Sequence, residues 1–390
     1  MNKKIKVLLV GLGSEIGSTL LSLLKSNSEN VEINGILTNK IFKNDLKKNF
    51  EAVIARIILN DPSMINDIKY YEKKSLLEIN KKKIKIFWGD ITKFDVSKIK
   101  SNFDFTIIAT SKDHINKKHL MKKFLKVSKF VFGVAESVNL PSLYPNFVNF
   151  RSNLFEIEPR NIYDFKDKIF ALGSCQTNGW QSQLRLIAEI FNKLKMSNLK
   201  MMGCELDIVH PDTPQGRLGT KSMSPREQDA RNNLRPGFSQ VEKSMKKFFN
   251  KAYMKNTISL RTLISPPGYQ IARFYINYST RNNEIVSKEY FKKNVIKFCK
   301  RNKFKIQYTE SSLGSRAFEK VESSSVLLLN DQYFQFNNNF LNKNEKDSKI
   351  LQIVLQSYVH NTRGYCRSVI QTIKEVMSRY KRKKRIYCWR

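Results

Sequence analysis

One of the five cysteines lies where a thiol could act as a nucleophile. Cys175 follows the short apolar run KIFALGS and begins a segment whose apolar residues have helical spacing. At the first turn of a helix, the helix dipole and the free N–H groups stabilise a thiolate. Because most single cysteines are buried core thiols, this position alone does not establish catalysis. The other four lack the paired spacing of metal ligands, and no metal site is expected: Cys204, Cys299, Cys366 and Cys388.

A glycine-rich segment near the N-terminus is a second candidate site. The sequence GLGSEIG lies between an apolar run and a helical pattern. Such a turn lets the backbone approach a pyrophosphate that rests on the N-terminus of the following helix. The spacing is one residue longer than the GxGxxG fingerprint, so a purely structural turn is the alternative. The residues expected to contact a dinucleotide are Gly11, Gly13, Ser14, Glu15, Ile16 and Gly17.

The end of the second predicted strand bears on the choice of cofactor. The run ILTNK contains no Asp or Glu that would accept hydrogen bonds from the adenine ribose. Thr38, Asn39 and Lys40 could instead tolerate a 2′-phosphate. The expected cofactor is therefore NAD or NADP, and Asn39 is a candidate contact.

Alternating strands and helices must position these residues. Buried-strand patterns occur at 5–10, 31–37, 84–88, 105–109 and 129–135, with helical or loop segments between them. This alternation favours an α/β fold with an N-terminal Rossmann-type, doubly wound parallel sheet, and the glycine turn lies where such a sheet binds a dinucleotide. From Lys200 onward, longer alternating strands predict an α+β catalytic domain with a mixed or antiparallel sheet.

Two domains and a tail are expected, because 390 residues are enough for two hydrophobic cores. Residues 1–174 would form the dinucleotide-binding domain, completed by a C-terminal helix at 361–380. Residues 175–360 would form the catalytic domain. Residues 381–390 would form a basic tail.

The composition favours anionic partners. The chain contains 70 Lys and Arg against 34 Asp and Glu, a formal charge of +36. The lysines are spread along the whole chain, as biased codon usage would produce, whereas a nucleic-acid surface concentrates charge in one patch. Nucleic acid is therefore a less favoured partner than a small anionic molecule. No apolar run is long enough to span a bilayer and no export signal is evident, so a cytoplasmic protein is expected.

Several motifs resemble one enzyme family. The sequence SCQTN at 174–178 resembles the SCTTN active-site sequence of the glyceraldehyde-3-phosphate dehydrogenases. Four further segments resemble parts of that family and follow in the same order. DIVHPDT resembles the strand that carries its catalytic histidine, and NLRP resembles its NIIP sequence. LRTLISPP resembles the strand that carries its substrate-binding arginine, and SYVHNTRGYCRSV resembles its WYDNEFGYSNRV sequence. Only SCQTN and HNTRGY are specific individually. Together with the glycine turn, however, the matches span nearly the whole chain and are hard to obtain by chance.

The resemblance implies aldehyde oxidation through a cysteine thioester. Cys175 would attack the aldehyde carbon, and His210 would act as the base that takes the thiol proton. The backbone N–H of Cys175 would help to hold the oxyanion. Asn361 would bind the carboxamide of the nicotinamide, and Tyr365 would line the pocket. The resemblance also implies a homotetramer.

The substrate implied by the resemblance is an anionic aldehyde, either phosphorylated or sugar-derived. Arg261 and Thr213 match residues that hold the phosphate of the substrate, and Ser174 and Gln176 belong to the same site. Gln176 replaces the first Thr of SCTTN, and PGFSQ at 236–240 replaces the run that binds inorganic phosphate. These departures weigh against glyceraldehyde 3-phosphate and against a phosphorylating second step. The two alternatives are therefore the glycolytic enzyme itself and a paralogue that oxidises another phosphorylated or sugar-derived aldehyde.

Two other functions fit parts of the sequence. A nucleic-acid-binding or scaffold protein on the same fold would suit the net charge, but it would have no reason to retain Cys175 and His210. A semialdehyde or acyl-phosphate reductase uses the same thioester chemistry, although those families place their histidine much later in the chain.

Overall fold

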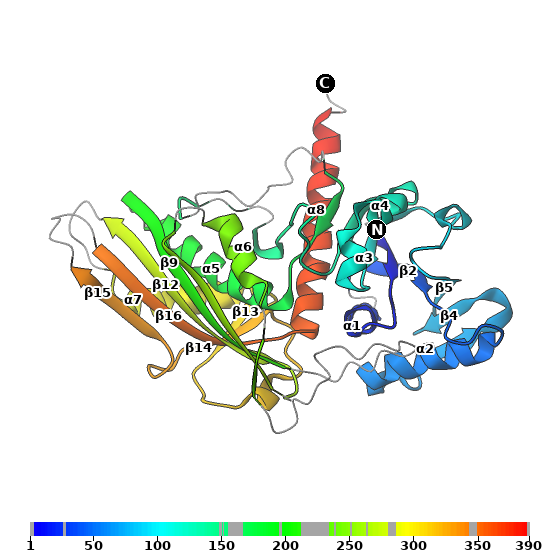
Figure 1. The fold of residues 1–390 in the computed structure, drawn as a ribbon, viewed down its shortest axis with the longest axis horizontal. Coiled ribbons are helices and arrows are strands. Elements are labelled where there is room, and N and C mark those ends of the chain that lie inside the picture. The colour runs from blue at the N-terminus through cyan, green and yellow to red at the C-terminus, as the bar shows by residue number, and fades with distance from the viewer. Residues whose placement is uncertain are drawn as a thin grey trace.

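The computed structural model describes residues 4–25, 29–147, 150, 152–154, 167–194, 197–211, 234–237, 239–249, 252–262, 264–279, 286–342 and 349–387. Within these residues the chain forms two eight-stranded sheets, one from β1–β8 and one from β9–β16. Figure 1 shows the sheets at opposite ends of the molecule, with helix α8 between them. The protein is therefore a mixed α/β structure.

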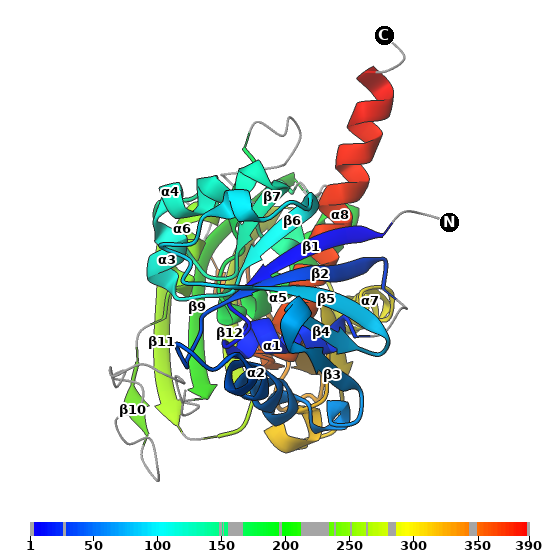
Figure 2. The same ribbon diagram turned by 90° about the vertical axis from the view of Figure 1, so that its right-hand side faces the viewer.

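The first sheet has the strand order β3-β4-β5-β2-β1-β6-β7-β8, and Figure 2 shows its central strands side by side. Its strands are β1 (Ile5–Val10), β2 (Val31–Thr38), β3 (Ile68–Tyr71), β4 (Leu76–Ile79), β5 (Lys82–Trp88), β6 (Phe103–Ile108), β7 (Ser128–Gly133) and β8 (Ile169–Ala171). From β5 to β8 all neighbours are parallel, whereas β3 and β4 join the edge in antiparallel pairs. The sheet is therefore mixed, whereas the sequence pattern predicts a parallel sheet. Strands β3 and β4 have only four residues each, too few for a clear alternation.

Helices cover both faces of the first sheet. On β1, Val7 and Leu9 pack in one hydrophobic cluster with α1 (Glu15–Leu23) and α2 (Leu46–Asn60). Leu8 and Val10 pack in a second cluster on the opposite face, which includes side chains of α3 (Lys112–Asn116) and α4 (Lys118–Lys122). Because each face is buried, β1 is an almost continuous apolar run.

Helix α8 (Arg363–Tyr387) returns the end of the chain to the first sheet. Tyr365, Cys366 and Val369 belong to the same cluster as α1. The helix extends into the segment 381–390 that the sequence pattern assigns to a tail, and its end projects from the body of the molecule in Figure 1. Lys and Arg are good helix formers, and no Gly or Pro follows Gly364, so nothing ends the helix at the basic block.

The second sheet has the order β10-β11-β9-β12-β16-β14-β13, and β15 also pairs with β16. Its strands are β9 (Ser197–Pro211), β10 (Arg235–Pro236), β11 (Met254–Thr262), β12 (Gly268–Ser279), β13 (Ile306–Thr309), β14 (Ser325–Leu328), β15 (Gln335–Asn342) and β16 (Lys349–Val359). The pairs β11–β9 and β13–β14 are parallel, and the remaining pairs are antiparallel. This sheet is mixed, as the sequence predicts.

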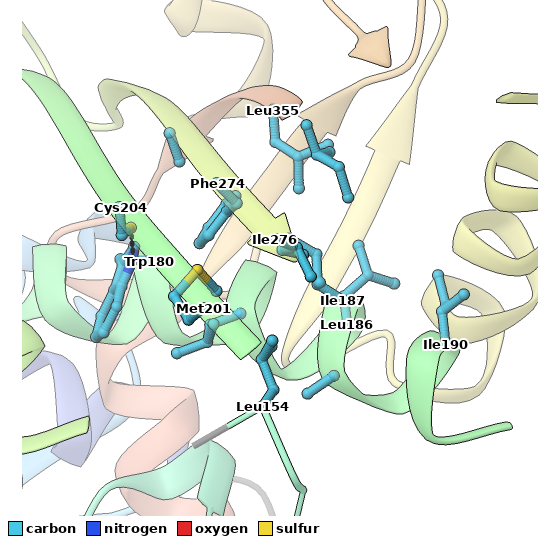
Figure 3. Packing of buried hydrophobic residues seen from close by; sticks show 14 of the residues in the cluster. Leu154, Trp180, Leu186, Ile187, Ile190, Met201, Cys204, Phe274, Ile276 and Leu355 are labelled. Carbon is cyan, nitrogen blue, oxygen red and sulfur yellow. Dashed lines mark hydrogen bonds between the residues drawn. The ribbon is translucent and has the colours of Figure 1, made fainter. Parts of the chain in front are cut away.

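One face of the second sheet packs against α5 (Cys175–Lys193), α6 (Val241–Phe248) and α7 (Lys288–Arg301). Figure 3 shows Trp180 of α5 against Cys204 of β9, and the indole Nε1 donates to the Cys204 Sγ at 3.2 Å. Phe274 and Leu355 from the neighbouring strands complete this part of the core. The packing fixes α5, and with it the position of Cys175 at the start of the helix.

Candidate active site

A pocket of about 1070 Å³ brings together side chains from the halves of the chain that form the two sheets. The predicted site residues that line it are Gly11, Gly13, Ser14, Glu15, Ile16, Asn39, Ser174, Cys175, Gln176, His210, Arg261 and Asn361. Gly17 is not among the lining residues, and Thr213 lies outside the described residues. Residues far apart in sequence therefore meet in one cavity.

The turn before α5 places Cys175 at the helix N-terminus. Ser174 is the N-cap, and its Oγ accepts a hydrogen bond from the Thr177 backbone N–H at 3.1 Å. The chain enters through Gly173, whose φ of 77° suits glycine. The hydroxyl of Tyr365 donates to the Gly173 carbonyl at 2.8 Å, and burial raises the pKa of Tyr365 well above its ordinary value. The protonated phenol therefore holds the turn from α8.

The Cys175 thiol faces the imidazole of His210. Their Sγ and Nε2 atoms are 3.9 Å apart, within the reach of a hydrogen bond to sulfur. His210 lies near the end of β9, so the second sheet supplies the imidazole and the strand-to-helix junction supplies the thiol. This geometry allows the imidazole to take the thiol proton.

Two groups lie beside the other ring nitrogen of His210. Its Nδ1 is 2.6 Å from the Pro211 carbonyl and 3.1 Å from a guanidinium nitrogen of Arg261. A carbonyl only accepts and a guanidinium only donates, so Nδ1 can satisfy just one of them at a time. When Nδ1 carries the proton, Nε2 carries the lone pair that can accept a proton from Cys175. The site therefore offers a partner for either neutral tautomer.

The remaining described cysteines are in a different environment. Cys204, Cys299 and Cys366 are buried, whereas Cys175 is partly exposed. Burial raises the pKa of Cys204 and of Cys299 to about 12, and it raises that of Cys366 well above its ordinary value. Thiols that stay protonated at neutral pH are poor nucleophiles. Among the described cysteines, Cys175 is the best placed for covalent chemistry.

Arg261 lines the same end of the pocket. It lies on β11, in register with His210 on the parallel strand β9, and its residue is only 7% exposed. A Cβ added at Gly237 would lie 2.9 Å from the Arg261 Nε, so the glycine makes room for the guanidinium. A largely buried guanidinium that faces a pocket is well suited to an anionic ligand.

At the other end of the pocket, the three glycines of GLGSEIG have different roles. Gly11 has a φ of 95°, and a Cβ there would lie 2.6 Å from the Ala109 carbonyl oxygen. A Cβ on Gly17 would lie 2.3 Å from the Gly11 carbonyl oxygen, so this glycine serves the packing of the turn. A Cβ on Gly13 would meet nothing within 4 Å. Gly13 therefore borders the open space into which a ligand could approach the backbone.

The N-terminus of α1 completes this glycine end. The Ser14 hydroxyl accepts from the Gly17 N–H at 3.0 Å, while the N–H groups of Glu15 and Ile16 have no acceptor within the helix. Those donors fit a pyrophosphate. An ionised Glu15 carboxylate would repel an anion at this end. Burial raises the pKa of Glu15 and so favours its neutral form, and the positive charge of Arg56 only partly offsets this shift.

Asn361, which the resemblance assigns to the nicotinamide carboxamide, is hydrogen-bonded to Gln176. The Gln176 Nε2 donates to the Asn361 Oδ1 at 3.0 Å, and the Gln270 Nε2 donates to the Gln176 Oε1 at 2.5 Å. Gln176 is only 4% exposed. Its amide is engaged with Asn361 and Gln270, and Gln176 also lines the pocket, so its contact with substrate stays a prediction.

Several pocket residues were not predicted from the sequence: Arg56, Thr110, His114 and Glu136. Ser239 and Gln240 of the PGFSQ segment also line the pocket. Thr110 and Glu136 follow β6 and β7, and ligands of open α/β sheets bind beyond the carboxyl ends of strands. That rule could have identified both residues. Glu136 is 3% exposed and accepts from the Lys247 Nζ at 2.7 Å, so it also joins the first sheet to α6.

Within the described part of the chain, no group of three or more His, Cys, Asp or Glu side chains is arranged to hold a metal ion. None of the described helices is both long and apolar enough to cross a membrane. In comparisons with known proteins, no family model and no curated protein sequence matches the chain. The geometry of the site and the motif resemblance are therefore the observations that point to a function.

Proposed function

We propose that this chain is an NAD(P)-dependent aldehyde dehydrogenase of the glyceraldehyde-3-phosphate dehydrogenase type, which oxidises an anionic aldehyde through a thioester on Cys175. One observation carries the proposal: the Cys175 Sγ lies 3.9 Å from the His210 Nε2, in a pocket that also contains Arg261 and the glycine turn. A nucleophile, a base, a cation and an anion-binding helix terminus are the parts that this chemistry needs.

The reaction begins when the His210 Nε2 takes the proton of the Cys175 thiol. The thiolate attacks the aldehyde carbon, forming the C–S bond and an oxyanion beside the start of α5, where backbone N–H groups stabilise negative charge. Loss of a hydride from the same carbon leaves a thioester. Attack by an acyl acceptor such as water breaks the C–S bond, releases the acid and restores the thiolate. A bound nicotinamide would supply the hydride acceptor.

The first sheet supports a Rossmann-type dinucleotide-binding domain. Its parallel part, β5-β2-β1-β6-β7-β8, changes direction of strand order between β1 and β6, where ligands of doubly wound sheets bind. Gly11, Gly13 and the first turn of α1 lie at this edge and would hold the pyrophosphate. Asn39 follows β2 without a neighbouring acid, which leaves room for a 2′-phosphate and makes NADP as suitable as NAD.

The substrate end favours an anionic aldehyde because Arg261 lines it. Use of inorganic phosphate as acyl acceptor is less well supported, since Ser239 and Gln240 of the PGFSQ segment line the pocket where the family has its phosphate-binding run. We therefore expect added phosphate to accelerate turnover little. The homotetramer implied by the resemblance and the cytoplasmic location expected from the sequence also belong to this proposal, and light scattering tests the first.

A reduction assay tests the proposed function. NAD⁺ and NADP⁺ reduction would be followed with phosphorylated aldehydes, dicarboxylic semialdehydes and matched neutral aldehydes, each with and without inorganic phosphate. The proposal predicts turnover with an anionic aldehyde and little effect of phosphate. A strong, saturable phosphate requirement with glyceraldehyde 3-phosphate would identify an ordinary phosphorylating enzyme instead, and reduction with none of the aldehydes would contradict the proposal.

A further inference from the structure

Four buried amides form a hydrogen-bonded chain that ends at the pocket. The Gln183 Nε2 donates to the Gln270 Oε1 at 3.4 Å, and the Gln270 Nε2 donates to the Gln176 Oε1 at 2.5 Å. The Gln176 Nε2 donates in turn to the Asn361 Oδ1 at 3.0 Å. All four residues are at most 9% exposed. The amide chain therefore runs from Gln183 on α5 to Gln270 on β12 and returns to Gln176 at the start of α5. It ends at Asn361, two residues before α8.

The backbone fixes the direction of this amide chain. The Gln270 Nε2 also donates to the Gln176 backbone carbonyl at 2.9 Å, and a carbonyl can only accept. Gln270 must therefore keep its NH2 group toward Gln176. The Gln176 Oε1 must then face Gln270, and its Nε2 must face Asn361.

Asn361 is the end of the amide chain, and its own orientation follows. Because its Oδ1 accepts from Gln176, its Nδ2 is left without a hydrogen-bond partner among the described residues. Asn361 lines the pocket, so the amide presents a donor and not an acceptor to a ligand. An Asn with no such support could turn its amide either way at little cost.

We propose that Gln176 and Gln270 are positioning residues that hold the Asn361 amide with its NH2 group toward the pocket. This part of the pocket then selects a ligand group that offers a carbonyl oxygen. The inference rests on the proposed function in one respect: it identifies that group as the carboxamide of a nicotinamide cofactor.

Paired titrations separate positioning from general structural support. Gln176→Leu removes the donor, and Gln176→Glu keeps the size of the side chain but replaces the donor to Asn361 with an acceptor. Each would be titrated with NADP⁺ and with 2′-phospho-ADP-ribose, which lacks the nicotinamide. We expect the affinity for NADP⁺ to fall about threefold to tenfold, as for one lost hydrogen bond, while that for 2′-phospho-ADP-ribose stays unchanged. Equal losses for both ligands, or no loss for either, would overturn the proposal.

Gln181→Leu is the matched control. Gln181 lies on the same helix, is fully buried, and its amide has no hydrogen-bond partner among the described residues. The control should change neither affinity. If Gln176→Leu does not fold, Gln176→Glu and Gln270→Leu supply the same comparison.

Neutron diffraction on the deuterated, ligand-free protein decides the orientation without any cofactor. Deuterons on the Asn361 nitrogen that face the pocket are expected, and an Asn361 oxygen in that position would overturn the proposal. Failure of the wild-type protein to bind any nicotinamide nucleotide would contradict the proposed function, and the neutron result would still settle whether the amide chain orients Asn361.

Discussion

The two ends of the pocket are built in different ways. At the cysteine end, side chains hold one another: Cys175 faces His210, which contacts Arg261, and Tyr365 holds the turn at Gly173. At the glycine end, the backbone provides the surface, through a tight turn and the N–H groups at the start of α1. The first arrangement suits bond making at one carbon, and the second suits a long, charged ligand.

This difference predicts how each end responds to substitution. Changes at Cys175, His210 or Arg261 should affect turnover and leave cofactor affinity intact, because these side chains would act on the aldehyde. Changes at the glycine end should affect cofactor affinity and leave the chemical step intact. Results that mix the two patterns would show that the ends are not separate.

The largest effect is expected at the nucleophile. Cys175→Ser should lower kcat by about four orders of magnitude or more, as for loss of a covalent nucleophile, while NADP⁺ affinity stays nearly unchanged. Steady-state kinetics and a binding titration measure the two quantities. In the wild type, iodoacetamide should label Cys175 before Cys204 or Cys299, because burial raises the pKa of both other thiols to about 12. Retention of more than a few per cent of the activity would exclude the thioester mechanism.

A smaller effect is expected at Arg261. Arg261→Ala should lower kcat/KM for an anionic aldehyde by about 10- to 1000-fold, since a hydrogen bond to a charged group is worth about 1.5–3 kcal/mol and the guanidinium also touches His210. A neutral aldehyde of the same length should lose less. Equal losses for both aldehydes would show that Arg261 serves His210 alone and does not bind the anion.

At the glycine end, two neighbouring substitutions should separate binding from stability. Gly13→Ala places a methyl group in open space at the pocket, so we expect about tenfold weaker NADP⁺ binding with no change in melting temperature. Gly17→Ala would place a Cβ 2.3 Å from the Gly11 carbonyl oxygen, and it should lower the free energy of unfolding by about 1–3 kcal/mol. Unchanged NADP⁺ affinity in Gly13→Ala would show that the glycine turn does not bind the cofactor.

Glu15 offers a pH-dependent test of the same end. Burial raises the pKa of its carboxyl above the ordinary value of 4.5, so its ionisation disfavours the folded state. The contribution of the protonated carboxyl to folding stability is complete below pH 4.5, and it is lost as the pH rises through the raised pKa. Glu15→Gln should lack this loss and, at pH 8, bind NADP⁺ a few-fold more tightly, because a negative charge near the pyrophosphate is removed. The gain in affinity should vanish as the pH falls through the raised pKa, and a gain that is constant with pH would contradict this account.

The smallest effect concerns the choice of cofactor. With no acid after β2, NADP⁺ should bind at least as tightly as NAD⁺ in isothermal titration. Tighter binding of NAD⁺ by more than about tenfold, roughly 1.4 kcal/mol, would refute the assignment.

Features that leave a local pattern in the sequence could be predicted, and features that depend on tertiary packing could not. The parallel strands β1, β2, β5, β6 and β7, the long strands of the second sheet and the glycine turn leave local patterns, and Cys175 lies in a recognisable motif, so these features were predictable. Strands β3 and β4 were missed because each has only four residues. The extent of α8 was missed because a basic block is compatible with a tail as well as with a helix.

The amide chain could not be predicted, for a different reason. Gln176 and Gln183 both lie on α5, but Gln270 and Asn361 come from distant parts of the sequence, and glutamine has no local signature for burial. The sequence around Gln183 does not distinguish it from Gln181 on the same helix. Yet the Gln183 amide is hydrogen-bonded within the amide chain, whereas the Gln181 amide has no partner in the described structure. Tertiary packing alone makes that distinction.

The most direct test of the central claim is mass spectrometry of the enzyme during turnover. The protein would be mixed with NADP⁺ and an active aldehyde, quenched with acid and digested. We expect the acyl mass of the substrate on the peptide that contains Cys175, together with a burst of NADPH of at most one equivalent per chain, and neither signal in Cys175→Ser. Reduction of NADP⁺ without any adduct on Cys175, or an adduct on another cysteine, would contradict the account.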